Sequence, residues 1–248
     1  MKQVMLTPSM GKRLIARAML RHPHVQAALA KGRLLIIAGT TNGYIAEEIL
    51  RASGQMGSFR REGFYRGLVV PPGVSQPPPQ FLGDVLLTDG VHQPGRTAFD
   101  VAGQLGAGDV ILKGANALDL HRKRAAVYVA HTECGTAGAV LPAVVGRRAR
   151  LIVPVGLEKR VEGDLSELAA LANSPDCEGP RLLVLPGEVF TELEAMALLS
   201  GCRCCLAAAG GIRGAEGCVF LLAQGNEAQL QSAQQVVESL AYEPPCQV

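Results

Sequence analysis

The chain has 248 residues, of which 48% are apolar and 19% charged, and it carries a net charge of +2. This balance gives no electrostatic reason to expect nucleic acid or a membrane surface as a partner. No stretch approaches the roughly 18 uninterrupted apolar residues of a membrane-spanning helix, and the amino terminus lacks the apolar core of a signal peptide. We therefore expect a cytoplasmic globular protein without nucleic-acid or membrane partners.

The first predicted element is a helix that begins at Thr7-Pro8, bends at His22-Pro23 and ends at Ala30. Five apolar runs follow, and each ends in a short segment of glycine, small polar and ionisable residues. Runs of this length are typical of strands buried on both faces, as in a parallel sheet covered by helices. The five segments are 34–43, 85–90, 110–116, 127–135 and 151–159.

Helices are predicted between these strands at 44–52, 96–106 and 136–147, so the order is that of βαβ units. Residues 56–82 interrupt this order with two Gly-rich turns and the Pro-rich segment 69–82. A loop this long in a compact domain is usually functional or mobile, so we expect a lid or an oligomer contact here.

The order of elements changes after residue 163. A helix, a strand, a second helix, a pair of strands and a third helix predict a smaller α+β unit with an antiparallel hairpin. The predicted elements are helix 164–173, strand 181–185, helix 190–200, strands 202–208 and 218–223, and helix 226–241. The predicted fold class is therefore α/β. Residues 1–160 are expected to form a ligand-binding three-layer αβα sandwich with a mostly parallel sheet, and residues 161–248 a smaller, ferredoxin-like α+β domain.

The segment Gly39-Thr40-Thr41-Asn42-Gly43 is the strongest candidate for binding a ligand. Ligands of parallel sheets bind beyond the carboxyl ends of the strands. A strand that leads through a Gly and hydroxyl loop into a helix offers free backbone N–H groups and a positive helix dipole, which suit a phosphate. The loop lacks the Walker lysine and the dinucleotide fingerprint, which disfavours ATP and NAD. The alternative is an ordinary turn in which a threonine caps the helix.

Asp89 and Lys113 each follow a predicted strand and adjoin a glycine. A carboxylate and an ammonium that converge on one cleft would serve as proton-transferring base and as stabiliser of an enediolate. Gly114 and Asn116 would then contact the substrate. Alternatively, Asp89 caps a turn and Lys113 pairs with it structurally.

The turn after the fourth strand contains Glu133, a candidate base or acyl-accepting nucleophile, with Gly135 and Thr136 as candidate ligand contacts. Glu158, after the fifth strand, is a further candidate for ligand binding. Its neighbour Lys159 has the opposite charge, and such adjacent pairs are most often simply exposed to solvent. The close cysteines Cys202 to Cys205 lie in an apolar run without a second pair at zinc spacing, so we expect reduced core thiols, no metal site and no cofactor.

Taken together, the Gly-Thr-Thr loop, the Asp-Gly strand end and the Lys-Gly segment resemble the superfamily of ribose-5-phosphate isomerases, glucosamine-phosphate deaminases, CoA transferases and methylthioribose-phosphate isomerases. The resemblance implies that Gly39, Thr40, Thr41 and Gly43 seat a phosphate, and that Asp89 and Lys113-Gly114 match family segments. It also implies a homo-oligomer.

The sequence therefore predicts a protein that binds a phosphorylated sugar or a similar small anionic metabolite, as an aldose–ketose isomerase with Asp89 or Glu133 as the base. One alternative is CoA-transferase-like acyl transfer through Glu133. The other is a non-catalytic module that senses a metabolite.

Overall fold

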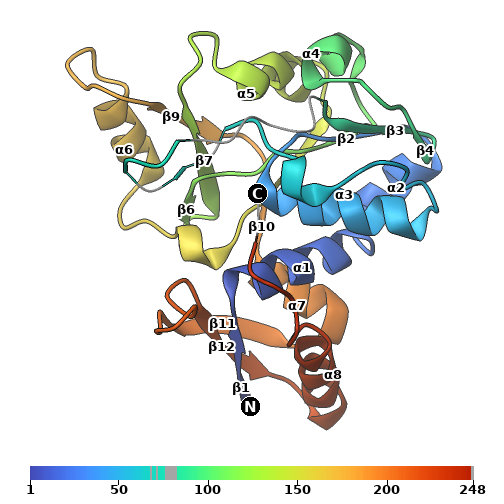
Figure 1. The fold of residues 1–248 in the computed structure, drawn as a ribbon, viewed down its shortest axis with the longest axis vertical. Helices are drawn as coiled ribbons and strands as arrows, with labels where there is room; N and C mark the ends of the chain where they lie inside the picture. Colours follow the sequence, from blue (N-terminus) through green and yellow to red (C-terminus); the bar gives the residue numbers. More distant parts are fainter. Residues whose placement is uncertain (68, 71, 76–82, 247–248) are drawn as a thin grey trace.

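The computed structural model describes residues 1–67, 69–70, 72–75 and 83–246, which form a mixed α/β fold with three β-sheets (Figure 1). The central sheet has six strands in the order β10-β8-β5-β2-β3-β4. Strands β2, β5, β8 and β10 are parallel, whereas β3 and β4 are antiparallel to their neighbours. The strands are β2 (Arg33–Ile36), β3 (Val85–Thr88), β4 (Val91–His92), β5 (Val110–Leu112), β8 (Arg150–Pro154) and β10 (Glu188–Phe190).

The direction of β3 corrects the predicted βαβ unit. Its pairing sets Ile36 opposite Val85, so β3 begins at the carboxyl end of β2. The path of the chain explains this direction. Helix α3 (Thr40–Ala52) leads to the amino end of the sheet, where the Gln55 amide donates to the Gly90 carbonyl, and the next segment returns to the carboxyl end, where Arg66 contacts Asp84.

The excursion predicted at 56–82 is therefore, in its described part, the return path that reverses β3. Its turn Arg61–Gly63 packs against the start of α3, where Gly43 leaves room for the Arg61 backbone. The lid or oligomer contact expected in this excursion stays a prediction, and residues 68, 71 and 76–82 of the excursion lie outside the described residues.

A second sheet contains β6 (Ala117–Asp119), β7 (Arg124–Val129) and β9 (Arg181–Leu185), all antiparallel. The strand predicted at the start of segment 127–135 thus belongs to this sheet and not to the central one, which is a second correction. Helix α6 (Leu165–Ala172) packs on this sheet.

The third sheet has the order β1-β12-β11 and is antiparallel, with β1 (Lys2–Leu6), β11 (Arg203–Ala209) and β12 (Val219–Gln224). The predicted hairpin of the last two strands is confirmed. The predicted ferredoxin-like unit is corrected, because strand 181–185 pairs elsewhere and the unpredicted strand β1 completes this sheet. Several pairings thus cross residue 160, and the division into 1–160 and 161–248 stays a prediction.

The remaining helices surround the sheets (Figure 1). The predicted break at His22-Pro23 is confirmed, because Pro23 begins a second helix. In Figure 1, α4 and α5 lie above β2 and β3, and α2 and α3 lie below them. Within the described residues, no helix is long and apolar enough to cross a membrane. The bounds are α1 (Pro8–Met19), α2 (Pro23–Ala30), α4 (Ala98–Val101), α5 (Gly135–Leu141), α7 (Glu192–Ser200) and α8 (Glu227–Glu238).

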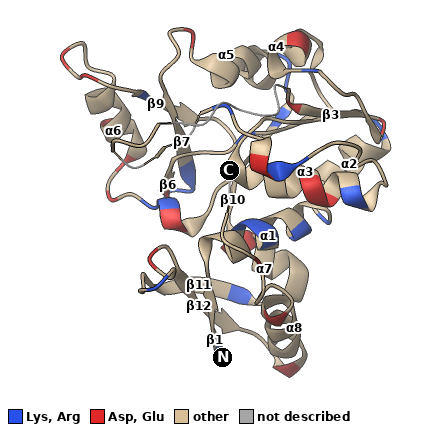
Figure 2. Ribbon diagram, in the orientation of Figure 1, with Lys and Arg blue, Asp and Glu red and all other residues tan. Residues whose placement is uncertain are grey.

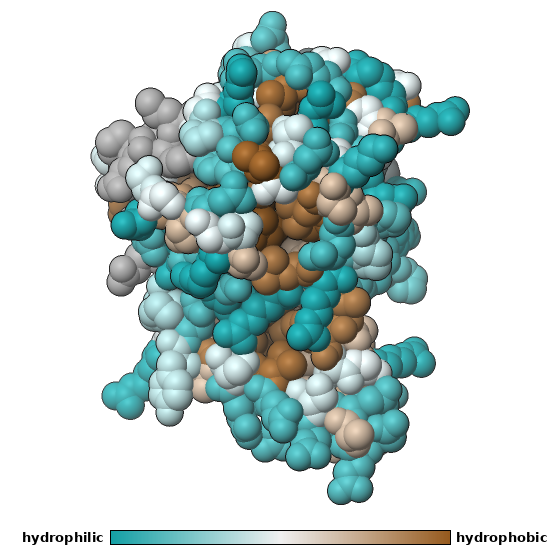
Figure 3. Space-filling view, turned by 90° about the vertical axis from the view of Figure 1, so that its right-hand side faces the viewer, coloured by the Kyte–Doolittle hydropathy of each residue, from teal (hydrophilic) through white to brown (hydrophobic). Residues whose placement is uncertain are grey.

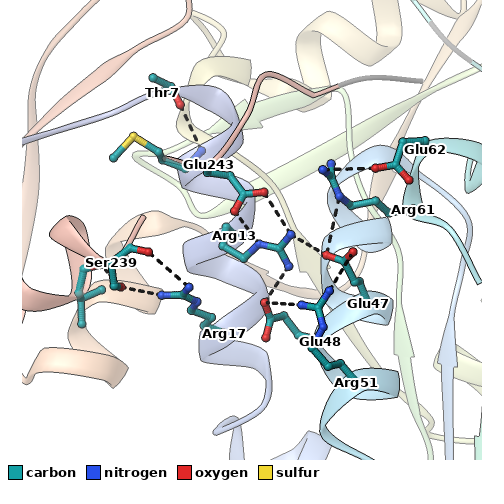
Figure 4. A network of polar contacts seen from close by, with 12 residues as sticks. Thr7, Arg13, Arg17, Glu47, Glu48, Arg51, Arg61, Glu62, Ser239 and Glu243 are labelled. Atoms are coloured by element: carbon teal, nitrogen blue, oxygen red, sulfur yellow. Dashed lines mark hydrogen bonds and ion pairs between the residues drawn. The ribbon is translucent and has the colours of Figure 1, made fainter. Parts of the chain in front are cut away.

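A buried arginine on α1 joins this helix to α3 and to the carboxyl-terminal segment (Figure 4). The Arg13 guanidinium lies 2.6 Å from Glu47, 2.7 Å from Glu48 and 3.0 Å from Glu243. Its side chain is only 7% exposed. Since hydrogen bonds to charged groups are among the stronger ones, this residue holds three separate segments of the chain together.

Substituting Arg13→Met is expected to lower the free energy of unfolding by about 3–5 kcal/mol, because three poorly solvated carboxylates each lose a close cation. The matched control is Arg51→Met, whose arginine also contacts Glu47 and Glu48 but is 56% exposed. It should cost about 1 kcal/mol or less. Urea denaturation measures both, and equal losses would contradict the assigned role of Arg13.

Candidate functional site

The carboxyl ends of β2, β5 and β8 lie side by side. The Ile37 amide donates to the Leu112 carbonyl, and the Lys113 amide donates to the Ile152 carbonyl. Any side chain that directly follows one of these strands is therefore brought to the same edge of the sheet. This edge is where parallel sheets bind their ligands.

Asp84 organises this edge from the start of β3. The residue is fully buried, and its Oδ1 accepts the Ala38 amide at 2.8 Å. Its Oδ2 accepts the Ala98 amide and the Arg66 guanidinium, each at 2.6 Å. The carboxylate is thus satisfied by donors from three segments. Asp84 was not among the residues expected at the site, although a single charge directly before an apolar run was a usable signal.

Lys113 follows β5 and is partly exposed. Desolvation by burial, with smaller contributions from Lys159 and Arg66, lowers the pKa of its ammonium to about 8, and the Asp84 charge opposes this shift. Among the described residues, its Nζ has no hydrogen-bond acceptor and no carboxylate within 4.0 Å. Lys113 is therefore a cation with space for an external partner.

The short turn Leu157–Lys159 after β8 contributes a second cation and a carboxylate (Figure 2). The Lys159 ammonium donates to the Ala115 carbonyl at 2.8 Å, and burial lowers its pKa. Glu158 lies 3.8 Å from Lys12 of α1. We call the following set the carboxyl-edge cluster: Lys12, Arg66, Asp84, Lys113, Glu158, Lys159 and Glu192.

Glu192, the first residue of α7, is a second buried carboxyl group in the cluster. Its carboxyl group lies against Gly11 of α1, where a Cβ would leave it no room, and its Oε2 accepts the Leu157 amide at 2.9 Å. Burial raises the pKa of Glu192 to about 8, and the neighbouring Glu158 charge adds to the shift. Burial and the neighbouring Glu158 charge thus favour the protonated form of Glu192.

Glu192→Gln tests this protonation through the pH dependence of stability. Because the folded pKa of Glu192 lies above its unfolded value, the wild type loses stability as the pH rises from about 4.5 to 8. The amide variant lacks this loss. As the pH rises through this range, the free energy of unfolding of the variant should therefore increase relative to that of the wild type by about 2 kcal/mol.

Urea denaturation at pH 5 and pH 8 measures this difference. The control is Glu178→Gln, which changes an exposed glutamate and should follow the wild type at both pH values. Parallel curves for the wild type and Glu192→Gln would show that Glu192 is ionised throughout.

Asp89 does not lie beside Lys113, so the predicted convergence of these two residues is wrong. Because β3 is antiparallel, its last residue is opposite Arg33, at the amino end of β2. There the Asp89 carboxylate accepts the Gly32 amide at 2.8 Å. Asp84, at the other end of the same strand, is the carboxylate near Lys113.

The loop Gly39 to Gly43 does lie at the carboxyl edge, at the start of α3. Gly39 is the N-cap, and no threonine side chain caps the helix, which corrects one of the predicted roles of Thr40 and Thr41. The Asn42 amide group donates to the Ile37 and Leu112 carbonyls and thereby ties β2 to β5. Thr41 Oγ1 and Asn42 Oδ1 are buried without a partner among the described residues.

Gly114 and Asn116, which follow Lys113 in the chain, were also predicted to contact the ligand. Gly114 has only the Pro154 carbonyl near the position of a Cβ, at 3.9 Å. Asn116 is structural, because its Oδ1 accepts the Tyr128 amide at 3.1 Å and so connects the central sheet to β7.

The turn that contains Glu133 follows β7 of the second sheet. The Glu133 side chain is exposed, and its amide donates to His131 Nδ1 at 3.1 Å. Gly135 begins the seven-residue helix α5, and Thr136 is buried in its first turn. The structure thus places these residues after a different sheet from the one that carries Lys113.

Two surface cavities lie away from the carboxyl-edge cluster. One of about 470 Å³ opens between α1, α3, α7 and α8 and is lined by Arg17, Leu20, Arg21, Glu48, Leu199, Ser232, Gln235, Val236 and Ser239. Figure 3, which shows this side of the molecule, has apolar residues near the centre with hydrophilic ones around them. The other, of about 380 Å³, adjoins β7 and β9. None of the predicted site residues lines either cavity.

Comparison of the chain with protein-family models, with curated proteins and with solved structures finds no match. Within the described residues, no group of three or more His, Cys, Asp or Glu is placed to hold a metal ion. The class that the structure defines is a mixed α/β protein with an ionisable cluster at the carboxyl edge of its central sheet.

Proposed function

We propose that the carboxyl-edge cluster binds a small phosphorylated metabolite with a carbonyl group and interconverts its aldose and ketose forms. The observation that carries this proposal is Lys113, a partly exposed ammonium at the end of β5 with no carboxylate within 4.0 Å among the described residues. A cation that the protein does not neutralise favours an anionic ligand.

The charges of the cluster support an anion. Four members are cations, whereas of the three carboxyl groups Glu192 favours its neutral form and Asp84 is occupied by its donors. The N-terminus of α3, a helix of 13 residues, adds amides without helical partners and the positive end of a dipole. Among the described residues, and apart from the chain neighbours of Gly39, no atom lies within 4 Å of the place of a Cβ on Gly39.

The reaction needs a base and a group that stabilises negative charge. The Glu158 carboxylate takes the proton from the carbon next to the carbonyl, and the electrons of that C–H bond move onto the carbonyl oxygen. Lys113 stabilises the resulting enediolate. A proton passes from the hydroxyl oxygen of the enediolate to the former carbonyl oxygen, and Glu158 returns its own proton to the former carbonyl carbon. The product is therefore an isomer, and no co-reactant is consumed.

Ribose 5-phosphate, hexose 6-phosphates and ribitol 5-phosphate should raise the melting temperature of the wild-type protein. A ligand at about 100 times its dissociation constant adds about 2.7 kcal/mol. Lys113→Ala should lose most of this stabilisation, and binding should weaken as the pH rises through about 8, where Lys113 loses its charge. Asp89→Asn, at the opposite end of the sheet, is the matched control and should bind as the wild type does.

Turnover separates an enzyme from a sensor. Glu158→Gln should lower kcat for aldose–ketose interconversion by about 100-fold or more with little change in ligand binding. Phosphorus NMR of the sugar phosphates measures both forms. Ligand binding without turnover in the wild type would favour the metabolite-sensing module, and a loss of acyl-CoA turnover only in Glu133→Gln would favour acyl transfer. Absence of any stabilisation by the phosphates would exclude the proposed function.

The proposal includes three broader features: a three-layer αβα arrangement of the central sheet, a homo-oligomer and a cytoplasmic location. Helices drawn on both sides of β2 and β3 support the first (Figure 1). The resemblance described above and the composition of the chain support the other two.

A further inference from the structure

We propose that Lys113 forms a covalent imine with the carbonyl carbon of an anionic aldehyde or ketone. This inference rests on the proposed function, since it concerns the same ligand site. It differs in the role of Lys113, which forms a covalent bond to the carbonyl carbon and does not act only through its charge.

The first argument is a comparison of the lysines in the cluster. The Lys159 ammonium is held by the Ala115 carbonyl at 2.8 Å, and Lys12 is paired with Glu158 at 3.8 Å. Lys113 alone among these three has no such partner in the described part of the chain. Lys113 is also partly exposed. A small molecule can therefore reach an amine whose lone pair is not engaged.

The second argument is the environment of Lys113. The nearest carboxylate that acts on it, Asp84, has both oxygens occupied by the Ala38 and Ala98 amides and by Arg66. The cations Arg66 and Lys159 and the loss of solvent all favour the neutral amine. Desolvation and neighbouring cations are the means by which proteins make a lysine nucleophilic.

The neutral fraction makes Lys113 chemically distinct. With a pKa of about 8, roughly a tenth of Lys113 is unprotonated at pH 7. An exposed lysine with the ordinary pKa of about 10.4 has roughly a hundredth of that fraction or less. Lys113 is thus expected to react with carbonyl compounds far ahead of the surface lysines.

The step balances without a further reagent. The Lys113 nitrogen adds to the carbonyl carbon to give a carbinolamine, and loss of one water leaves the imine. In its protonated form the imine draws electrons from the neighbouring carbon more strongly than the carbonyl does. It therefore helps Glu158 to remove the proton there. Return of the proton to that carbon restores the imine, and hydrolysis by one water then restores the amine and releases the carbonyl compound.

Borohydride trapping tests the proposal. The full-length protein is incubated with glyceraldehyde 3-phosphate, reduced with sodium cyanoborohydride and analysed by intact mass and peptide mapping. We expect one stable adduct per chain, located on Lys113, formed faster as the pH rises towards 8. Lys113→Arg, which keeps the charge, should lose the adduct, whereas the exposed-lysine control Lys31→Arg should keep it. Adducts spread over surface lysines, with Lys113 unmodified in the wild-type map, would overturn the proposal.

Ribitol 5-phosphate separates this inference from the proposed function, because it carries the phosphate but no carbonyl group. Protection of Lys113 from trapping by ribitol 5-phosphate would support both. Thermal stabilisation by ribitol 5-phosphate without any adduct on Lys113 would overturn the imine and leave the proposed function intact. An adduct on Lys113 that ribitol 5-phosphate does not reduce would support the imine and contradict the phosphate site.

Discussion

The Asp84 carboxylate holds the carboxyl edge of the central sheet in place. It accepts the backbone amide that ends β2, the amide that begins α4 and the guanidinium of Arg66 from the excursion after α3. These donors come from segments that are distant in the chain, and Asp84 is fully buried. A buried carboxylate is tolerated only when its oxygens are satisfied, so the three segments are constrained to meet there. Lys113 then lies near a carboxylate whose two oxygens already accept hydrogen bonds from other donors.

Helix α1 also connects separate parts of the fold, because three consecutive residues of this helix lie against five carboxyl groups. Gly11 makes room for Glu192, Lys12 pairs with Glu158, and Arg13 binds Glu47, Glu48 and Glu243. The helix follows β1 of the third sheet and packs on α3, so it joins that sheet to the central one. The cluster at the carboxyl edge therefore depends on the packing of α1 as much as on the strands.

The sequence located part of this site for a sound physical reason. Lys113 and Glu158 follow apolar runs that are parallel strands, and parallel strands deliver the residues after them to one edge. The same reasoning failed for Asp89, because an apolar run such as Val85–Thr88 has the same composition in either direction. Its orientation was decided by the excursion that returns the chain to the carboxyl edge. Arg66 and Glu192 carry no local signal, since each reaches the cluster from a segment with no obvious relation to it.

The sequence by itself determined the alternation of helices and buried strands, the break at His22-Pro23, the hairpin after residue 202 and the presence of Lys113 at a strand end. These features depend on periodicity, proline and local turns, which act over a few residues. Only the tertiary structure decided which strands share a sheet, that β1 completes the carboxyl-terminal sheet, and which charges remain unpaired at the carboxyl edge. Those outcomes depend on contacts between distant segments and on burial, which shifts the pKa of Lys113 and of Glu192. Neither the long-range contacts nor the burial can be read from the spacing of residues along the chain.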